Sequence, residues 1–188
     1  MKKNIIIFLI TIIIVISIFI YLYYYHVIRY ILRNMAIELF KTLNENEVTY
    51  WADFGTLLGL YRENDIILKD NDIDVCIIDD EKTHKKMSKV LETMSKKGYR
   101  TKKMDWSAYR VYKYFLFADI YINKIDKDVY IGATGKNSNI PIKFIGNSRW
   151  FKWGDINVKV PERIVDTLIW RYGDDYMTPK HNFKGRDS

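Results

Sequence analysis

The sequence contains a single cysteine, Cys76, and lacks any Asn-x-Ser/Thr glycosylation sequon. One cysteine excludes an intrachain disulfide and a zinc cluster built from cysteines. Because Cys76 lies in the apolar run from 73 to 78, we expect it to be a small buried residue. The histidines His26, His84 and His181 are scattered along the chain, which argues against a histidine metal site or a Ser/His/Asp hydrolase.

The sequence also lacks a block of basic residues. Its 30 lysines and arginines and its 23 acidic residues are intermixed and give a net charge of +7. This distribution is not typical of a nucleic-acid-binding arm, so we expect no nucleic-acid partner, and an anionic substrate or membrane surface fits the charge better. Without internal repeats or low-complexity linkers, the chain after its first two dozen residues is expected to form one catalytic domain.

The N-terminal segment is strongly apolar. Residues 5–25 carry no charge, and only Thr11 and Ser17 interrupt them with small polar side chains. A helix of about 20 apolar residues crosses a bilayer, whereas the apolar region of a signal peptide is only about 7–15 residues long. No small-x-small cleavage site follows. We therefore predict a membrane anchor over 1–26 and a catalytic domain over 27–188.

The flanks of this anchor leave its orientation open. Lys2 and Lys3 precede it and Arg29 and Arg33 follow it, so the positive-inside rule finds almost no difference. The tyrosines at 21 and 23–25 are typical of the aromatic belt at a membrane interface. The expected localisation is single-pass, of type II orientation, in an endomembrane or the cell membrane.

Hydrophobic periodicity after the anchor predicts an α/β (α+β) fold. Apolar residues from 27 to 44 recur every three or four positions, which predicts an amphipathic helix continuing out of the membrane. We expect a mixed sheet flanked by helices. The predicted strands are 48–52, 72–78, 99–104, 109–116 and 117–123, with a hairpin at 150–153 and 156–160. The predicted helices after the first are 57–61, 81–97 and 161–172, with a polar tail after Pro179.

Two aspartates on one predicted strand are the strongest chemical signal. Asp72 and Asp74 are two positions apart, so both carboxylates point to the same face while Ile73 and Val75 point to the other. Two adjacent carboxylates on an otherwise apolar strand are costly without a cation between them, and Mg²⁺ or Mn²⁺ binds such oxygen ligands. Asp70 belongs to the same cluster or orients the preceding loop.

A second signal lies upstream of these aspartates. Gly55 and Thr56 stand where a helix begins, and the free backbone N–H groups of a helix N-terminus bind phosphate. Arg62 is a candidate bidentate phosphate ligand. The alternative for Arg62 is an ordinary surface arginine. Together with the aspartates, these residues predict a site that handles phosphoryl groups.

These segments resemble the LicD and fukutin-related family. The family pattern is roughly G-T-L-L-G-x-x-R, a short spacer, and I-P-W-D-x-D-I-D. This sequence has Gly55-Thr56-Leu57-Leu58-Gly59-Leu60-Tyr61-Arg62, then Ile66-Ile67, then Asp70-Asn71-Asp72-Ile73-Asp74. It departs at Leu68-Lys69, where Pro-Trp is usual. The segment 171–179 is similar to the closing Y-G-x-x-[WY]-x-x-P motif of the family.

The resemblance implies a nucleotidyltransferase-type fold and a metal-dependent phosphotransferase. The donor would be CDP-linked and carry phosphocholine or ribitol phosphate, and the acceptor would be a glycan or glycoconjugate. In this fold a neighbouring strand supplies a third carboxylate, and Asp119 stands in the matching context, although it could instead be a structural capping acid. Asp72, Asp74 and Asp119 would hold Mg²⁺ or Mn²⁺, and Gly55, Thr56 and Arg62 would bind the donor. No zinc subsite is expected.

Two other functions remain open at this point. The same fold could transfer a nucleoside monophosphate from an NTP to a small molecule or sugar phosphate. Alternatively, the departure at Leu68-Lys69 and the short chain would suit a catalytically silent membrane-tethered scaffold. A further D-x-D pair, Asp126 and Asp128, is interpreted as a solvated turn and excluded from the site.

Overall fold

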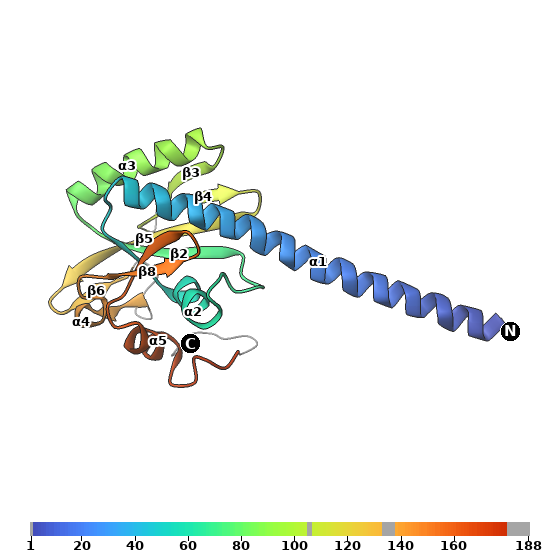
Figure 1. Ribbon diagram of the computed structural model, residues 1–188. Helices are drawn as coiled ribbons and strands as arrows, with labels where there is room; N and C mark the ends of the chain where they lie inside the picture. Colours follow the sequence, from blue (N-terminus) through green and yellow to red (C-terminus); the bar gives the residue numbers. More distant parts are fainter. Residues whose placement is uncertain (1, 105–106, 133–137, 180–188) are drawn as a thin grey trace.

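A mixed β-sheet forms the centre of the structure, a computed structural model that describes residues 2–104, 107–132 and 138–179 (Figure 1). The strands of this sheet are β1 (Tyr50–Ala52), β2 (Asp72–Ile78), β3 (Arg100–Met104), β4 (Ala108–Lys113), β5 (Leu116–Asp126), β6 (Val129–Ile131) and β7 (Ile140–Pro141). The order is β1-β2-β5-β4-β3, and β6 pairs with both β5 and β7. β2 and β5 are parallel, whereas the other pairs are antiparallel.

Helices cover both faces of this sheet. They are α1 (Lys2–Glu45), α2 (Phe54–Glu63), α3 (Glu81–Lys96), α4 (Ile142–Ile145) and α5 (Ile164–Tyr172). The domain half of α1 lies beside α3 on one face, while α2 and α5 contact each other on the opposite side (Figure 1). Alternate residues of β2 (Ile73, Val75 and Ile77) are buried in the main core under α1 and α3. The opposite face of β2 is therefore left for Asp72 and Asp74.

A two-stranded ribbon, β8 (Arg149–Trp153) and β9 (Ile156–Val160), closes the end of the core beside α1. Trp153 packs edge-on against Phe40 of α1, with ring centroids 6.3 Å apart. The Asn44 side-chain amide of α1 donates to the Asn157 carbonyl at 2.8 Å. The ribbon thus fixes the C-terminal half of α1 to the domain.

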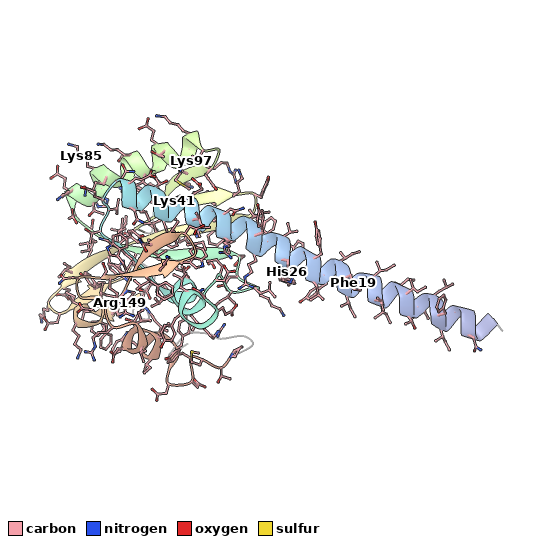
Figure 2. All side chains as sticks on the ribbon, viewed as in Figure 1. Phe19, His26, Lys41, Lys85, Lys97 and Arg149 are labelled. Atoms are coloured by element: carbon pink, nitrogen blue, oxygen red, sulfur yellow. The ribbon has the colours of Figure 1, made fainter. Side chains whose placement is uncertain are left out.

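The two halves of α1 have different environments. From Ile28 to Leu43 the inward-facing residues are buried in the main core, as the apolar periodicity predicted. The N-terminal half projects away from the domain, and Phe19 is 70% exposed (Figure 2). This half is long and apolar enough to cross a membrane.

Several sequence predictions are confirmed and others need correction. The predicted helix at 81–97, the strand at 72–78 and the hairpin at 150–160 match α3, β2 and the β8–β9 ribbon. The predicted strand 109–116 ends earlier, because the turn at Tyr114 has a positive φ of 58°. The short elements β6, β7 and α4 were not expected. The last predicted helix begins at Ile164, later than its Pro161 signal, and the tail beyond residue 179 lies outside the described residues.

Candidate active site

The pairing of β2 with β5 brings the predicted carboxylates onto one face of the sheet. Asp74 is the register partner of Asp119, and Asp72 is the partner of Phe117. Register partners on neighbouring strands point to the same face, so Asp72, Asp74 and Asp119 share it. Asp74 and Asp119 are buried, with exposed fractions of 8% and 3%. The three aspartates that were predicted as site residues therefore lie on one face of the sheet.

The N-terminus of α2 is joined directly to Asp74. The Gly55 N–H donates to Asp74 Oδ2 at 3.2 Å, and the Asp74 backbone N–H donates to the Thr56 hydroxyl at 2.7 Å. Thr56 is 2% exposed, and in this structure its hydroxyl connects the helix to the strand. Tyr121 donates its hydroxyl proton to Asp74 Oδ1 at 3.2 Å. The Asp74 carboxylate is thus oriented by two neutral donors.

The two glycines of the G-T-L-L-G motif allow two close approaches. A Cβ atom on Gly55 would lie 3.1 Å from Asp70 Oδ2 and 3.5 Å from Asp74 Oδ2. A Cβ atom on Gly59 would lie 2.6 Å from the Asp65 carbonyl oxygen. Gly55 therefore leaves room for the carboxylates, and Gly59 lets the loop before β2 pass against α2.

Burial and mutual repulsion raise the pKa values of three aspartates. Desolvation, followed by the charges of Asp72 and Glu63, raises the pKa of Asp70 to about 7. Desolvation and the charge of Asp119 raise the pKa of Asp72. Desolvation raises the pKa of Asp74 well above its usual range, and the charge of Asp72 is the next-largest cause. The sheet face that carries Asp72, Asp74 and Asp119 is called the acid-bearing face below. A cation bound there would stabilise the ionised carboxylates.

Arg110 is a site residue that the sequence analysis missed. It is the cross-strand partner of Asp119 on β4, and its guanidinium binds both carboxylate oxygens, with Nη2 2.6 Å from Oδ2. Its guanidinium also lies over the Phe117 ring, 4.2 Å from the centroid. An arginine on a predicted strand adjacent to Asp119 was the available signal. Among the described residues, no three acidic, histidine or cysteine side chains are placed so that they could hold a metal ion together.

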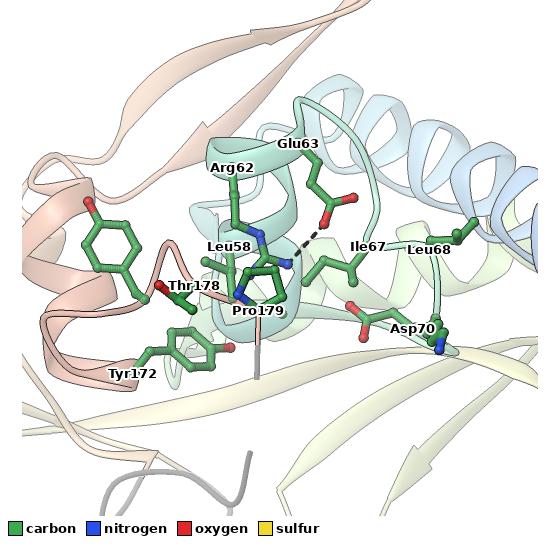
Figure 3. A pocket seen from close by; sticks show the side chains of 12 residues that line it. Leu58, Arg62, Glu63, Ile67, Leu68, Asp70, Tyr172, Thr178 and Pro179 are labelled. Carbon is green, nitrogen blue, oxygen red and sulfur yellow. Dashed lines mark hydrogen bonds and ion pairs between the residues drawn. The ribbon is translucent and has the colours of Figure 1, made fainter. Parts of the chain in front are cut away.

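A cavity of about 500 Å³ is lined by Asp70 and by Gly55, the residue whose N–H binds Asp74 (Figure 3). Asp72, Asp74 and Asp119 are not among its lining residues. Gly55, Arg62 and Asp70 are among its lining residues, so the predicted donor-binding segment borders it. The Arg62 guanidinium binds Glu63 at 3.0 Å, and its side chain is 13% exposed. The segment 171–179 also lines the cavity, through Tyr172, Tyr176, Thr178 and Pro179. The two motif segments thus meet at one pocket.

A buried ion pair holds these two segments together. Asp53, the N-cap of α2, receives bonds from Arg171 Nη2 at 2.7 Å and Arg171 Nε at 3.1 Å. Trp51 Nε1 also donates to Asp53, at 3.1 Å. The Asp53 and Arg171 side chains are 0% and 2% exposed. This pair was not predicted, because the sequence assigned no role to Asp53 and marked Arg171 only as part of the segment 171–179.

The second D-x-D pair lies outside the site. Asp126 ends β5 and Asp128 lies in the exposed turn to β6, where Lys127 has a positive φ of 52°. The interpretation of these two residues as a solvated turn is confirmed.

Comparisons with known proteins agree with this geometry. Residues 47–163 match the family model described as "LicD/FKTN/FKRP, nucleotidyltransferase domain". Uncharacterized protein RT0683 of Rickettsia typhi (strain ATCC VR-144 / Wilmington) is 37% identical over 60 residues, which span 32% of this chain and 19% of that protein. The chain therefore matches only about a fifth of the length of that relative.

Solved structures of the antibiotic-resistance factor ANT(2'')-Ia share the fold. Its crystal structure with adenylyl-2''-tobramycin has a TM-score of 0.51 at 14% identity, covering 73% of this chain and 71% of that one. Its solution structure has a TM-score of 0.53 at 14% identity, covering 78% and 74%. The family match covers more than half of the sequence and includes Gly55, Thr56, Arg62 and all three aspartates. The chain therefore belongs to the LicD/FKTN/FKRP family and has a nucleotidyltransferase-type fold.

Proposed function

We propose that this protein is a transferase that moves a phosphorylated alcohol, of the phosphocholine or ribitol phosphate type, from a CDP-linked donor to a glycan acceptor. The observation that supports this most directly is the position of Asp72, Asp74 and Asp119 on one sheet face, beside a pocket lined by both family motifs. A pocket of about 500 Å³ has the size of sites that bind small organic ligands.

The carboxylates fit a Mg²⁺ or Mn²⁺ ion by their chemistry. They supply hard oxygen ligands, and a cation beside Asp72 and Asp74 would offset the desolvation and like charges that raise their pKa values. Asp119 would join them after exchanging its bond with Arg110, whose guanidinium could then face the donor phosphates. A bound divalent ion would neutralise charge on the diphosphate.

The residues around the pocket would bind and orient the donor. Arg62 lines the pocket and would exchange Glu63 for a phosphate oxygen. Gly55 would let the diphosphate approach α2 because it has no side chain, and Thr56 would hold the helix terminus against β2. Phosphoryl transfer depends mainly on such positioning.

The reaction itself is a substitution at phosphorus. The acceptor hydroxyl oxygen would bond to the phosphorus that carries the alcohol, and the bond from that phosphorus to the bridging oxygen would break. CMP leaves with the electron pair of the broken bond. The hydroxyl proton passes to a carboxylate, for which Asp119 is the candidate, and then to solvent.

Product analysis tests this function. Full-length protein in detergent would be incubated with CDP-choline and CDP-ribitol, with Mn²⁺ or with EDTA. We expect release of CMP that depends on the metal. A protein that releases no CMP from any CDP-linked donor would contradict the proposal.

The second candidate is nucleotidyl transfer from an NTP. The fold likeness to ANT(2'')-Ia, whose crystal structure contains an adenylylated tobramycin, favours keeping it. Pyrophosphate release from an NTP, without CMP release from CDP-linked donors, would support this candidate. A silent scaffold would show no metal-dependent nucleotide binding by calorimetry.

The apolar half of α1 supports a single-pass membrane anchor. For this anchor we further propose a type II orientation, in an endomembrane or the cell membrane. We expect the full-length protein to remain in the pellet after alkaline carbonate extraction of membranes. Release into the supernatant would contradict the anchor.

A further inference from the structure

The active-site domain begins where the apolar stretch of α1 ends. Tyr25 is the last residue of that stretch and is already half-buried, and Ile28, less than one turn further on, is 7% exposed. Figure 2 shows His26 where α1 leaves the domain. The helix continues without a break from Lys2 to Glu45, so no linker separates the apolar stretch from the domain. The height of the domain above a membrane is therefore set by α1.

One wall of the pocket is attached to this part of α1. Lys69 places its ammonium 5.8 Å from the centroid of the Tyr25 ring. Arg29 binds Glu63 at 3.2 Å, and Arg33 binds Asp65 at 3.1 Å. Glu63 and Lys69 both line the pocket.

The attached wall carries groups that suit a lipid interface. Lys69 is exposed, Leu68 is half-buried, and both line the pocket. Figure 3 shows Leu68 on the same side of the pocket as α1. Lysine and tyrosine side chains favour the interface, where an apolar stem contacts lipid and a polar tip reaches the head groups.

We propose that the pocket opens onto the lipid head groups and takes an acceptor hydroxyl carried by a lipid in the same leaflet. This inference rests on the proposed phosphotransfer and on insertion of α1 in the membrane. A helix rises about 1.5 Å per residue, so Arg29 and Arg33 hold the wall roughly 6–12 Å beyond Tyr25. A head group attached to a lipid reaches that height. A freely diffusing glycan would reach a pocket at any height equally well.

Energy transfer to labelled lipids tests the geometry without requiring activity. Cys76 is buried, so a dye would attach selectively to Lys69→Cys in the full-length protein, in vesicles of phosphatidylcholine and phosphatidylglycerol containing a head-group-labelled acceptor lipid. Lys85→Cys is the matched control, because Lys85 is exposed at the end of the domain away from the N-terminal half of α1 (Figure 2). We expect strong transfer from position 69 and weak transfer from position 85. Equal transfer from both would overturn the proposal.

A flexible Gly-Ser insertion after His26 sharpens this test. It leaves the contacts of Arg29 and Arg33 with the pocket wall intact but separates the domain from the span. Transfer from the dye at position 69 should then fall. Unchanged transfer would show that α1 does not set the height of the pocket, which would overturn the geometric basis of the proposal.

The acceptor class is tested with membranes that contain the full-length protein. A donor labelled at the phosphorus that carries the alcohol would be added with Mn²⁺, and label would be measured in an organic lipid extract and in the aqueous fraction. Asp72→Asn membranes provide the blank. Label in the lipid extract would support the proposal. Label only in water-soluble material, with CMP released, would overturn it and leave phosphotransfer intact. Absence of CMP release would reject phosphotransfer and this acceptor together, whereas the energy-transfer result would stand by itself.

Discussion

The two faces of β2 carry opposite chemistry on the same seven residues. One face presents Ile73, Val75 and Ile77 to the core beneath α1 and α3. The other presents Asp72 and Asp74, which face Asp119 and the N-terminus of α2. The apolar face gains stability from burial, whereas the acid-bearing face loses stability by burying like charges. A strand that tolerates this loss indicates a functional site.

Two buried aspartates near the acid-bearing face differ in their hydrogen-bonding partners. Asp53 has a cation within the chain, because Arg171 binds both its oxygens. Asp74 is bound by the neutral Gly55 N–H and Tyr121 hydroxyl, and its pKa is raised well above the usual range, chiefly by burial. The difference separates an aspartate that stabilises the fold from one that is suited to bind an external cation. Four sets of substitutions test these two comparisons.

The largest change in stability should come from Arg171→Met. This variant leaves the Asp53 charge buried without its guanidinium, and breaking such a pair typically costs about 3–5 kcal/mol. Urea unfolding of the full-length protein in detergent would measure the loss. The double variant Asp53→Asn with Arg171→Met should recover part of it. If Arg171→Met unfolds at the wild-type urea concentration, the pair does not hold the two motif segments together.

The apolar face is tested by Ile77→Ala. Ile77 is fully buried, and truncating such a residue removes packing and leaves a cavity at a cost of about 2–5 kcal/mol. We expect the midpoint of urea unfolding to fall, while turnover per folded molecule stays close to wild type. A selective loss of turnover would mean that the two faces are not separable.

Asp74→Asn should raise the stability of the metal-free protein, by less than the two preceding substitutions lower it. Without metal, the amide removes a charge whose burial is unfavourable, so the melting temperature should rise. A gain of about 1 kcal/mol corresponds to about 2–4 °C for a protein of this size. Differential scanning calorimetry in EDTA measures the shift, and a lower melting temperature would show that the charge stabilises the fold.

The smallest effect is expected for Asp126→Asn and Asp128→Asn. Both residues are exposed at a hairpin turn, where surface substitutions usually change stability by less than about 0.5 kcal/mol. Their turnover and unfolding midpoints should match wild type. They therefore serve as controls with the same D-x-D sequence pattern as the candidate site.

The sequence predicted the parts of the site that depend on local pattern. The period of two placed Asp72 and Asp74 on one face, and apolar spacing predicted that the first helix continues into the domain. The family context pointed to Asp119, which β5 places beside Asp74. The Asp53–Arg171 pair joins residues 118 positions apart, and neither neighbourhood contains a signal for the other. The place of Arg110 beside Asp119 depends on the register of β4 with β5, which is set by the turn at Tyr114 that the sequence did not predict.

Metal-dependent release of CMP from a CDP-linked donor shows whether Asp72 and its neighbours form a catalytic site. Wild type, Asp72→Asn and Asp126→Asn would be compared at equal folded concentration with Mn²⁺ and with EDTA. We expect Asp72→Asn to remain folded and to lower turnover by a factor on the order of 10²–10³, and we expect the turnover of Asp126→Asn to equal that of wild type. If Asp72→Asn keeps wild-type turnover, the acid-bearing face is not the catalytic site. If even the wild type shows no metal-dependent turnover or nucleotide binding, a membrane-tethered scaffold becomes the better account.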